Sequence, residues 1–561
     1  MSEELLQTIP HWIGRYSYYK LGDSTLGQLK KDKIINKLSK PLSAKKPDGL
    51  ITLSGGIVKA VIEYKLPAEL STLAQIKKAI NQEIDVAKFL CKLLIVTDGT
   101  KSFWINALNG DEIKQNGNKI NFVFDAGKIL SDSITIEEKI DLENLIDQAD
   151  YSLTENNNYI VEPEILDPTP LAREVWQKIW INTGKEPEKC LYNVVEIFVF
   201  KFLSDIGVLE YYNNFNSVYE RKERAGSNAA LTHYANDCRK PIKNEMFPKG
   251  DDGTTIFNGT IFINENGEAN LSQAELFSDV LDSFQKYDEE HGSFRYVTKE
   301  FKTRLYETFL RQSAGVKNLG QYFTPRNVVQ AMVKMSSANQ LKRGAKICDP
   351  FCGVGGFILE TISMNENIFR EFEPKNGVIN PQIIMRGYDK GTDEKDDERT
   401  IILAKSNMLI YFSDLLAKYH TIEHLHSFST NAFNSVFHLI RSNLGTFGKI
   451  DDEKYDLILT NPPYVTNSSS NIKKSAAQLR TSSGKPYYTL KGRGIETLAL
   501  EWIVKKLAAG GEAIIIVPDG LLLQKSIINY FKKECIINAI ISLPRNTFYA
   551  TSKNSLPLIR S

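Results

Sequence analysis

A short apolar run that ends at two prolines constrains this chain more than any other feature. Residues 457–459 are typical of a buried strand, and Asn461, Pro462 and Pro463 follow almost at once. Proline has no backbone donor, so a central strand cannot continue through it. We therefore expect Asn461 at the carboxyl end of a strand, which is where open α/β sheets build their binding sites.

This corner suits chemistry on an exocyclic amine of a nucleobase. Such an amine is a poor nucleophile because its lone pair is delocalised into the ring. The side-chain oxygen of Asn461 and the backbone carbonyl of Pro462 could each accept one N–H, and Tyr464 could stack on a base that has been flipped out of a helix. The alternative is purely structural, a proline-terminated strand with a buried asparagine.

The composition is that of an ordinary globular protein with several domains. Its 561 residues predict about three or four domains, and 42% hydrophobic with 24% charged residues is unexceptional. The net charge of +1 does not exclude a nucleic acid, because a local basic surface is compatible with overall neutrality. No apolar run would span a bilayer and no signal peptide is present, so we expect a cytoplasmic protein without a membrane partner. The six scattered cysteines suggest core thiols rather than zinc.

Near the N-terminus, two apolar segments around a Gly-Gly turn predict a β-hairpin. Asp48 begins the first strand, and Glu63 and Lys65 lie two residues apart near the end of the second, so they share one face. Asp48 can lie beside Glu63, and two carboxylates can hold a divalent cation. The cation would lower the pKa of a bound water that Lys65 orients. The alternative is a surface hairpin with an ion-paired glutamate and lysine.

These residues resemble the PD-(D/E)xK nuclease pattern, and more narrowly the N-terminal domain of type I restriction subunits and of fused restriction–modification enzymes. An expected helix over residues 73–90, which contains Gln82, and a strand over 93–97 complete a β-β-α-β order. The resemblance implies an α/β nuclease-like domain over residues 1–155. It implies Mg2+ on Asp48 and Glu63, with Lys65 as the third catalytic residue. A further acid often sits on an upstream helix in such folds, and Glu3 and Glu4 are both candidates.

The middle of the chain predicts a linker and an α-helical domain over residues 156–318. Residues 151–170 are polar and contain prolines, and the apolar residues of 171–180 and 190–209 recur at helical spacing. A later helix, expected over 299–312, carries Lys302, Arg304 and Arg311, which could face DNA or form an ordinary solvated face.

The C-terminal region alternates strands and helices, as a doubly wound α/β fold does. Thr324 is expected to be the N-cap of a helix with Pro325 in its first position. A strand over 346–349 runs into a glycine-rich turn, and a second strand ends at Asp389, which is placed to bind ribose hydroxyls. The glycines follow Asp-Pro rather than a G-x-G-x-x-G fingerprint, which disfavours NAD.

In chain order the motifs are GQYFTP, DPFCGVGG, GYD, NPPY and VPDG. Together they resemble the S-adenosylmethionine-dependent adenine-N6 DNA methyltransferases, in the pattern of type I modification subunits. The resemblance implies a Rossmann-like methyltransferase domain over residues 319–561. The flipped adenine would be held by Asn461, Pro462, Pro463 and Tyr464. The residues implied to contact S-adenosylmethionine are Gln321, Tyr322, Phe323, Thr324, Pro325, Arg326, Asp349, Gly353, Gly355, Gly356 and Asp389.

Two features after these motifs are less defined. Relatives often carry an acid after the third strand that binds the adenine amine, whereas this chain has Asn431 in a polar stretch, and that contact stays unassigned. Residues 465–494 are basic and contain no acid, so they could grip phosphates or form a mobile solvated loop. No segment remains to read the DNA sequence, so we expect a chain without a target-recognition domain, either truncated or dependent on a separate specificity subunit.

The sequence therefore predicts a multidomain restriction–modification protein that acts on double-stranded DNA. A Mg2+-dependent nuclease domain would precede a helical domain and an adenine-N6 methyltransferase. The alternative is a modification-only protein whose nuclease-like domain is inactive. Methyltransferases that act on proteins or ribosomal RNA also use NPPY, but GQYFTP and the nuclease-like domain argue against them.

Overall fold

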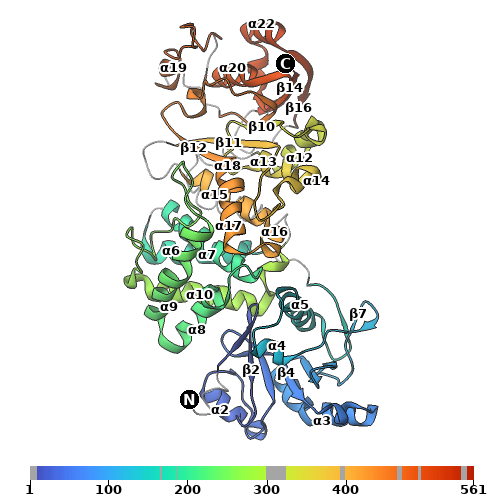
Figure 1. Cartoon of the computed structure of the whole chain (residues 1–561). Helices are drawn as coiled ribbons and strands as arrows, with labels where there is room; N and C mark the ends of the chain where they lie inside the picture. The colour runs from blue at the N-terminus through green and yellow to red at the C-terminus, as the bar shows by residue number, and fades with distance from the viewer. Residues whose placement is uncertain are drawn as a thin grey trace. The chain divides into compact units, whose positions relative to one another are not determined.

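The computed structural model divides the chain into two compact units (Figure 1). Unit 1 comprises Met1–Leu171, Phe198–Cys238 and Phe262–Thr298, and unit 2 comprises Ala172–Ile197, Arg239–Ile261 and Lys299–Ser561. The segment expected to form one helical domain thus contributes to both units. The structure describes residues 9–163, 167–185, 187–297, 324–391, 398–463, 471–490, 494–544, 547 and 553–560.

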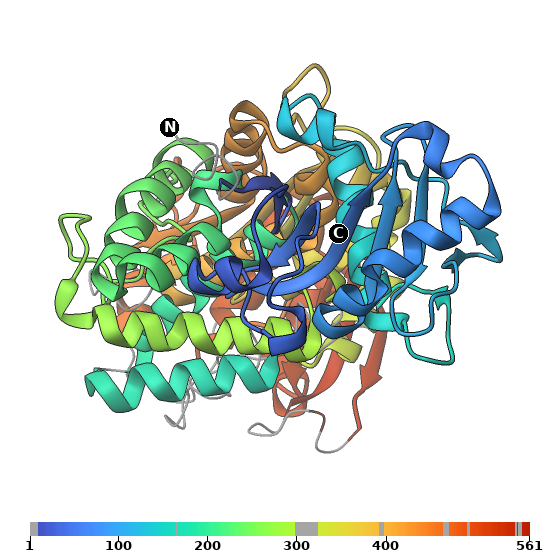
Figure 2. The same ribbon diagram turned by 90° about the horizontal axis from the view of Figure 1, so that it is seen from below.

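Unit 1 is built on a six-stranded sheet whose order follows the chain. Its strands are β1 (His11–Ile13), β2 (Tyr16–Lys20), β3 (Gly49–Leu53), β4 (Ile57–Tyr64), β5 (Leu93–Thr97) and β6 (Ser102–Asn106). Neighbours are antiparallel except β4 and β5, which are parallel and are joined by helix α3 (Leu73–Leu90). The β-β-α-β order expected from the sequence is therefore present, and α3 packs against β4 and β5 (blue in Figure 2).

The hairpin of β3 and β4 depends on its two glycines and on alternation along β4. Gly55 and Gly56 have φ angles of +79° and +72°, which side chains rarely adopt. An added Cβ on Gly56 would also lie 3.0 Å from the backbone of residues 35 and 36. Along β4, Val61 packs in the same hydrophobic cluster as buried side chains of α3, so Glu63, two residues later, points to the α3 side of the sheet.

Helices and a small sheet complete unit 1. Arg15, between β1 and β2, pairs with Asp147 and Asp288, and Lys201 pairs with Asp205 and Asp288. All five side chains are at most 5% exposed, so this buried ion-pair network joins the sheet to α5, α7 and α10. The elements are α2 (Leu26–Lys31), β7 (Lys114–Gln115), β8 (Asn118–Lys119), α4 (Ala126–Leu130), α5 (Ile136–Ser152), β9 (Tyr159–Ile160), α8 (Phe215–Ala225), α9 (Ser227–His233) and α10 (Ala274–His291), with the last residues of α7 (Pro187–Asp205).

Unit 2 contains an eight-stranded sheet in the order β12-β11-β10-β13-β14-β17-β15, with β16 paired to β17. The strands are β10 (Lys346–Asp349), β11 (Ile384–Gly391), β12 (Phe437–Arg441), β13 (Tyr455–Thr460), β14 (Leu507–Ile515), β15 (Val517–Pro518), β16 (Ile536–Ser542) and β17 (Lys553–Arg560). Strands β10 to β14 are parallel, and β17 runs antiparallel to its three neighbours. The strand order reverses between β10 and β13, which is the position where such sheets bind ligands. The predicted doubly wound α/β fold is confirmed.

Helices cover both faces of this sheet (Figure 1). Helix α13 packs on β10 and α15 on β12, whereas Trp502 of α20 packs on the other face beside Tyr455. The helices are α12 (Arg326–Met335), α13 (Gly356–Met364), α14 (Glu366–Phe369), α15 (Arg399–Tyr411), α16 (Ser413–Lys418), α17 (Ile422–Phe428), α18 (Asn434–Val436), α19 (Asn471–Ala476), α20 (Glu496–Lys506), α21 (Asp519–Leu522) and α22 (Lys525–Glu534), preceded by α6 (Thr169–Thr183) and most of α7. None of the helices in the described ranges is both long and apolar enough to cross a membrane.

Two local features of the unit 2 sheet are irregular. Gly510 and Gly511, a pair typical of turns, lie inside β14, which pairs with β13 through an irregular register after Leu507. At the outer edge of the sheet, the Asp252 carboxylate accepts a hydrogen bond from the backbone of Leu439 in β12 and pairs with Lys405. A backbone N–H of an edge strand thus donates to a charged side chain and is not available to a strand of another chain.

Candidate active sites

Asn461 lies immediately after β13 and is half-buried. Its Nδ2 donates a hydrogen bond of 2.9 Å to Oγ1 of Thr324, which orients the amide with its carbonyl oxygen Oδ1 on the opposite branch. Thr324 was expected to cap α12, and that expectation is wrong. Pro325 is the N-cap and no side chain caps the helix, because the Thr324 hydroxyl is engaged by Asn461 instead.

Only part of the corner expected around Asn461 lies within the described residues. Pro462 is buried and Pro463 is half-buried, and no cis peptide bond occurs in the described chain. Tyr464 lies outside the described residues, as do Gln321, Tyr322 and Phe323.

A small cavity of about 60 Å³ lies beside Asn461. Asp349, at the end of β10, contributes to its wall. Its Oδ1 accepts hydrogen bonds from Thr460 Oγ1 at 2.7 Å and from the backbone of Phe351 at 3.2 Å, whereas its buried Oδ2 has no hydrogen-bond partner among the described residues. Burial raises the pKa of Asp349 to about 7 against the effect of the Thr460 bond, and the charge of Asp389 adds to the rise. The lining includes Thr324, Arg326, Asp349, Phe351, Gly356, Glu360, Asn407, Tyr411 and Asn461.

The same cavity contains a second buried oxygen without a partner. Asn407 of α15 donates from Nδ2 to the backbone oxygen of Val354 at 3.2 Å, but its Oδ1 is buried and accepts no hydrogen bond from the part of the chain that the structure describes. Sequence reasoning missed this residue. Its signal was weak, an asparagine beside Lys405 and Ser406 in a largely apolar helical segment. By contrast Arg326, which also lines the cavity, is paired with Glu360 of α13 at 2.6 Å.

The three glycines of the turn after β10 have different surroundings. An added Cβ on Gly355 would lie 2.6 Å from the ring of Phe437, and its φ angle is +83°, so Gly355 is required for packing. An added Cβ on Gly353 or Gly356 would meet no atom of the described residues within 4 Å, so these two positions leave the backbone open to a ligand. Asp389 lies near the end of β11, half-buried, and its Oδ1 accepts a 2.8 Å bond from the backbone of Lys390.

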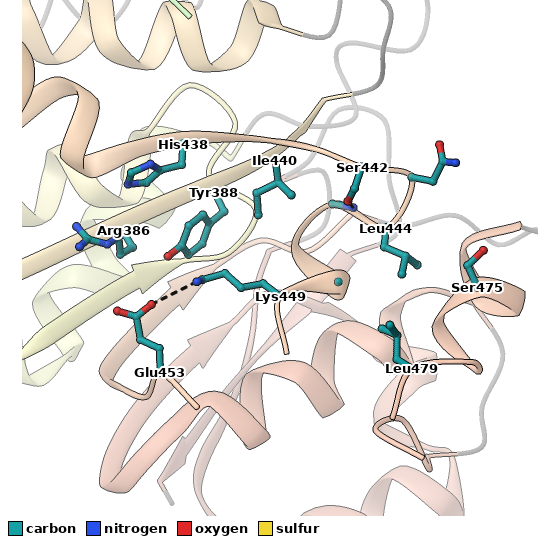
Figure 3. A pocket seen from close by; sticks show the side chains of 13 residues that line it. Arg386, Tyr388, His438, Ile440, Ser442, Leu444, Lys449, Glu453, Ser475 and Leu479 are labelled. Carbon is teal, nitrogen blue, oxygen red and sulfur yellow. Dashed lines mark hydrogen bonds and ion pairs between the residues drawn. The ribbon is translucent and has the colours of Figure 1, made fainter. Parts of the chain in front are cut away.

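A hollow of about 750 Å³ lies on the sheet face along β11 and β12 (Figure 3). Tyr388 and His438 point into it, and the connection from β12 to β13 contains only the short 3-10 helix η13 (Gly445–Gly448), so that no long helix covers this part of the face. Asn431 precedes the third strand β12 instead of following it. The residues that follow this strand are Ser442 and Asn443, and both line the hollow.

Part of the basic segment is anchored rather than loose. The described residues 471–490 include Tyr487 and Tyr488, which are buried in the core, and the hydroxyl of Tyr488 donates to the backbone oxygen of Phe447 at 2.7 Å. Residues 465–470 and 491–493 of the segment, and the basic helix expected over 299–312, lie outside the described residues.

In unit 1 the structure brings together the three residues singled out in the hairpin. Asp48 precedes β3 and accepts a 2.7 Å hydrogen bond from the backbone of Tyr64, and Glu63 pairs with Lys65. Burial raises the pKa of Glu63, the Lys65 bond opposes this, and Asp48 adds to the rise. Burial alone would lower the pKa of Lys65, but the bond to Glu63 and the charge of Asp48 raise it instead.

A further acid from α3 faces this group. Glu83 is 8% exposed, and its buried Oε2 has no hydrogen-bond partner. Burial raises the pKa of Glu83 to about 7, and the charge of Glu63 adds to the effect. Gln82, the helix residue noted in the sequence, is exposed, and Glu3 and Glu4 lie outside the described residues. In the described part of the chain, no three His, Cys, Asp or Glu side chains are arranged to hold a metal ion together.

Comparisons with known proteins show what the chain is similar to. A family model described as N-6 DNA Methylase matches residues 298–559, which include nearly all of the unit 2 sheet together with Asp349 and Asn461. Among curated proteins, the chain is 25% identical over 283 residues to the methylase subunit of the type I restriction enzyme EcoEI of Escherichia coli, a match that covers 50% of this chain and 49% of that one. The EcoKI methylase subunit of Escherichia coli K12 is 24% identical over 276 residues, or 48% of this chain and 45% of that one.

One solved structure is a modification subunit of a putative type I restriction enzyme from Vibrio vulnificus YJ016. It matches with 18% identity and a TM-score of 0.44, over 71% of this chain and 82% of that one. The chain spans about half the length of the curated relatives that it matches.

Proposed function

We propose that this chain transfers a methyl group from S-adenosylmethionine to the N6 amine of adenine in double-stranded DNA. The observation that carries the proposal is the position of Asn461. It follows the fourth parallel strand, is oriented by Thr324, and borders a cavity whose buried Asp349 oxygen has no partner. The match of this region to the N-6 DNA Methylase model supports the same reaction.

The residues present fit S-adenosylmethionine on chemical grounds. The molecule is a cation at its sulfonium and carries an ammonium group, and the cavity presents acceptor oxygens of Asp349 and Asn407 that lack partners. Gly353 and Gly356 leave the backbone open, and Asp389 at the end of the adjacent strand would hold the ribose hydroxyls. When bound, the cofactor supplies an electrophilic methyl group.

The residues of this chain would make the target amine reactive. Oδ1 of Asn461 and the carbonyl oxygen of Pro462 each accept one N–H of the flipped adenine, which draws the amine toward tetrahedral geometry and frees its lone pair. Thr324 holds the amide of Asn461 in the required orientation, so it is a positioning residue. The two prolines keep the carbonyl of Pro462 rigid, and Tyr464 stacks on the base.

The test is product analysis with isotopically labelled S-adenosylmethionine. Purified protein is offered unmethylated double-stranded DNA, RNA and protein separately, with and without a specificity subunit of the type I class. We expect N6-methyladenine in DNA alone. Label found only in RNA or protein would refute the substrate class.

A second activity is favoured by the arrangement in unit 1. We propose that Asp48 and Glu63 bind Mg2+ and that Lys65 orients the attacking water, so that the chain cleaves unmethylated DNA. The paired placement of these residues, with the orphan oxygen of Glu83 beside them, supports a cation site. The alternative is a modification-only protein that depends on a specificity subunit and whose nuclease-like part serves DNA binding or assembly.

The two alternatives differ in one experiment. Lys65→Ala should abolish Mg2+-dependent cleavage and leave methyl transfer unchanged. Lys101→Ala, an exposed lysine of the β5–β6 turn, is the matched control. Robust methyl transfer with no cleavage under any condition would favour the modification-only alternative.

A further inference from the structure

We propose that the lysine-rich segment of residues 30–46 binds the phosphate backbone of double-stranded DNA and leads the duplex to the acidic group of Asp48, Glu63 and Glu83. The inference rests on the proposed action on DNA and deepens it, because it names the surface of unit 1 that contacts the substrate. It holds whether unit 1 cleaves DNA or only binds it, since both roles require contacts to phosphates.

The segment is far more basic than the rest of the chain. Residues 30–46 contain seven lysines and one acid, whereas the whole chain carries a net charge of +1. All seven lysine side chains are exposed. Lys46 pairs with Asp23, but most of the others make no ion pair with any residue that the structure describes. The seven are Lys30, Lys31, Lys33, Lys37, Lys40, Lys45 and Lys46.

Buried apolar side chains fix the backbone of this segment on the sheet of unit 1. Leu29, Ile34 and Ile35, within or just before the basic run, pack in the same hydrophobic cluster as buried residues of α3. Glu63 points to the α3 side of the sheet, so the segment and Glu63 lie on one side of it. Because the backbone is held in place, little ordering would oppose the binding of a ligand by the lysines.

Two backbone hydrogen bonds set the course of the segment along the β3–β4 hairpin. The N–H of Asn36 donates to the oxygen of Gly56 at 2.8 Å, at the hairpin turn, and the N–H of Leu26 donates to the oxygen of Lys45 at 2.9 Å. From Asn36 the chain runs to Asp48, just before the opposite end of β3. The lysines are therefore spread along the five residues of β3, a distance of about 16 Å.

The basic segment ends beside the acidic group. Lys45 and Lys46 come just before Asp48 in the chain. Burial and the charge of Glu63 raise the pKa of Glu83 to about 7, whereas the charge of Lys45 lowers it, so Lys45 lies close to that acid. A phosphate bound by Lys45 would thus lie next to the carboxylates that are proposed to hold Mg2+.

The chemistry of the segment favours the backbone of a duplex over a single strand. A lysine ammonium binds phosphate as a point charge and does not read the base. The segment contains no aromatic residue, whereas single strands are bound largely by stacking of their bases on aromatic rings. Duplex DNA carries one negative charge per about 1.7 Å of its axis, so about 16 Å of lysine surface can face roughly nine phosphate charges.

The experiment measures binding of a fluorescent DNA duplex to the full chain by anisotropy over a series of salt concentrations, without divalent cations so that no DNA is cleaved. Single-stranded DNA and duplex RNA of the same length are the comparison probes. The variant carries Lys31→Gln, Lys37→Gln, Lys40→Gln and Lys45→Gln, which remove four lysines without an ion pair among the described residues.

Two further variants separate the position of the charge from its amount and from the fold. The matched control removes the same charge from exposed lysines elsewhere in unit 1, through Lys88→Gln, Lys114→Gln, Lys119→Gln and Lys286→Gln. The other variant replaces the four lysines of the segment by arginine, which keeps the positive charge.

The glutamine variant of the segment should bind the duplex at least about tenfold more weakly at about 0.1 M salt. The slope of log affinity against log salt should become shallower by about three to four, because each phosphate contact contributes about 0.9. The control should change the slope by less than about one, and the arginine variant should keep the wild-type slope. If the fourfold variant folds poorly, Lys40→Gln with Lys45→Gln should give about half of the change in slope.

Three outcomes would overturn the inference. Equal losses in the segment variant and the control would mean that net charge alone accounts for binding, and an unchanged slope would mean that the segment contacts no phosphate. A loss confined to single-stranded DNA or to RNA would assign the lysines to another ligand. If the wild type binds no duplex even at low salt, the inference fails, and methyl transfer to DNA by the same preparation shows whether the proposed function fails with it.

Discussion

The buried carboxylate of Asp349 predicts a dependence of stability on pH that Asp349→Asn should remove. Burial raises the pKa of Asp349 from 3.8 to about 7 in the folded chain. A group whose pKa is raised on folding favours the folded state while it stays protonated and disfavours it once it ionises. The ligand-free protein should therefore lose stability as the pH rises toward and through about 7.

The magnitude follows from the size of the shift. Each pKa unit corresponds to about 1.4 kcal/mol, so a shift from 3.8 to about 7 amounts to about 4 kcal/mol at high pH. Of that total, about 3 kcal/mol is lost between about pH 5 and about pH 8. Asparagine keeps an oxygen that can accept the bonds from Thr460 and Phe351, so Asp349→Asn should fold and should lack this loss.

The assay is scanning calorimetry of ligand-free protein across that pH range, followed on the transition that S-adenosylmethionine shifts. The difference between the wild-type and Asp349→Asn midpoints should change by roughly 5 °C, because about 3 kcal/mol moves the midpoint of a large domain by that amount. Asp456→Asn, which removes a carboxylate from the start of the neighbouring strand β13, controls for net charge. Parallel profiles for the wild type and Asp349→Asn would refute the reasoning.

Two further predictions concern packing. Lys201→Met should lower the free energy of unfolding of unit 1 by about 3–5 kcal/mol, since it leaves buried carboxylates without their cation. Lys286→Met, at an exposed pair of the same spacing in the same unit, should cost about 0.5 kcal/mol or less. Denaturant unfolding of both variants checks this, and equal losses would contradict it. Gly355→Ala should lower the free energy of unfolding by about 2–4 kcal/mol, because its Cβ would contact Phe437 and its φ is positive. Gly356→Ala should fold normally and weaken cofactor binding. Thermal midpoints and calorimetric affinities separate the two effects, and a stable Gly355→Ala protein would be evidence against the packing role.

The elements that sequence predicted best are those marked by local chemistry. The strand before Asn461, the turn at Gly55 and Gly56, and the strand ending at Asp349 each carry a stop or turn signal within a few residues. The pairing of Asp48 with the end of β4 followed from the geometry of a hairpin alone.

The features that sequence could not supply depend on contacts between distant segments. The hydrogen bond between Thr324 and Asn461 joins residues 137 positions apart. Because of it, the Thr324 hydroxyl contacts Asn461 and does not cap helix α12, as the local sequence had predicted. The buried faces of α3 and α15 put Glu83 and Asn407 beside acidic groups that lie elsewhere in the chain. The third strand β12 was missed because its sequence, FHLIR, mixes polar and apolar residues at a sheet edge.

The most direct test of the central claim is single-turnover methyl transfer by Asn461→Ala with saturating S-adenosylmethionine and unmethylated DNA. If Asn461 activates the adenine amine, the rate should fall by roughly 10²–10³, the usual effect of removing one preorganised hydrogen-bonding group, while affinity for S-adenosylmethionine stays within about twofold. A variant that methylates adenine at the wild-type rate would contradict the account.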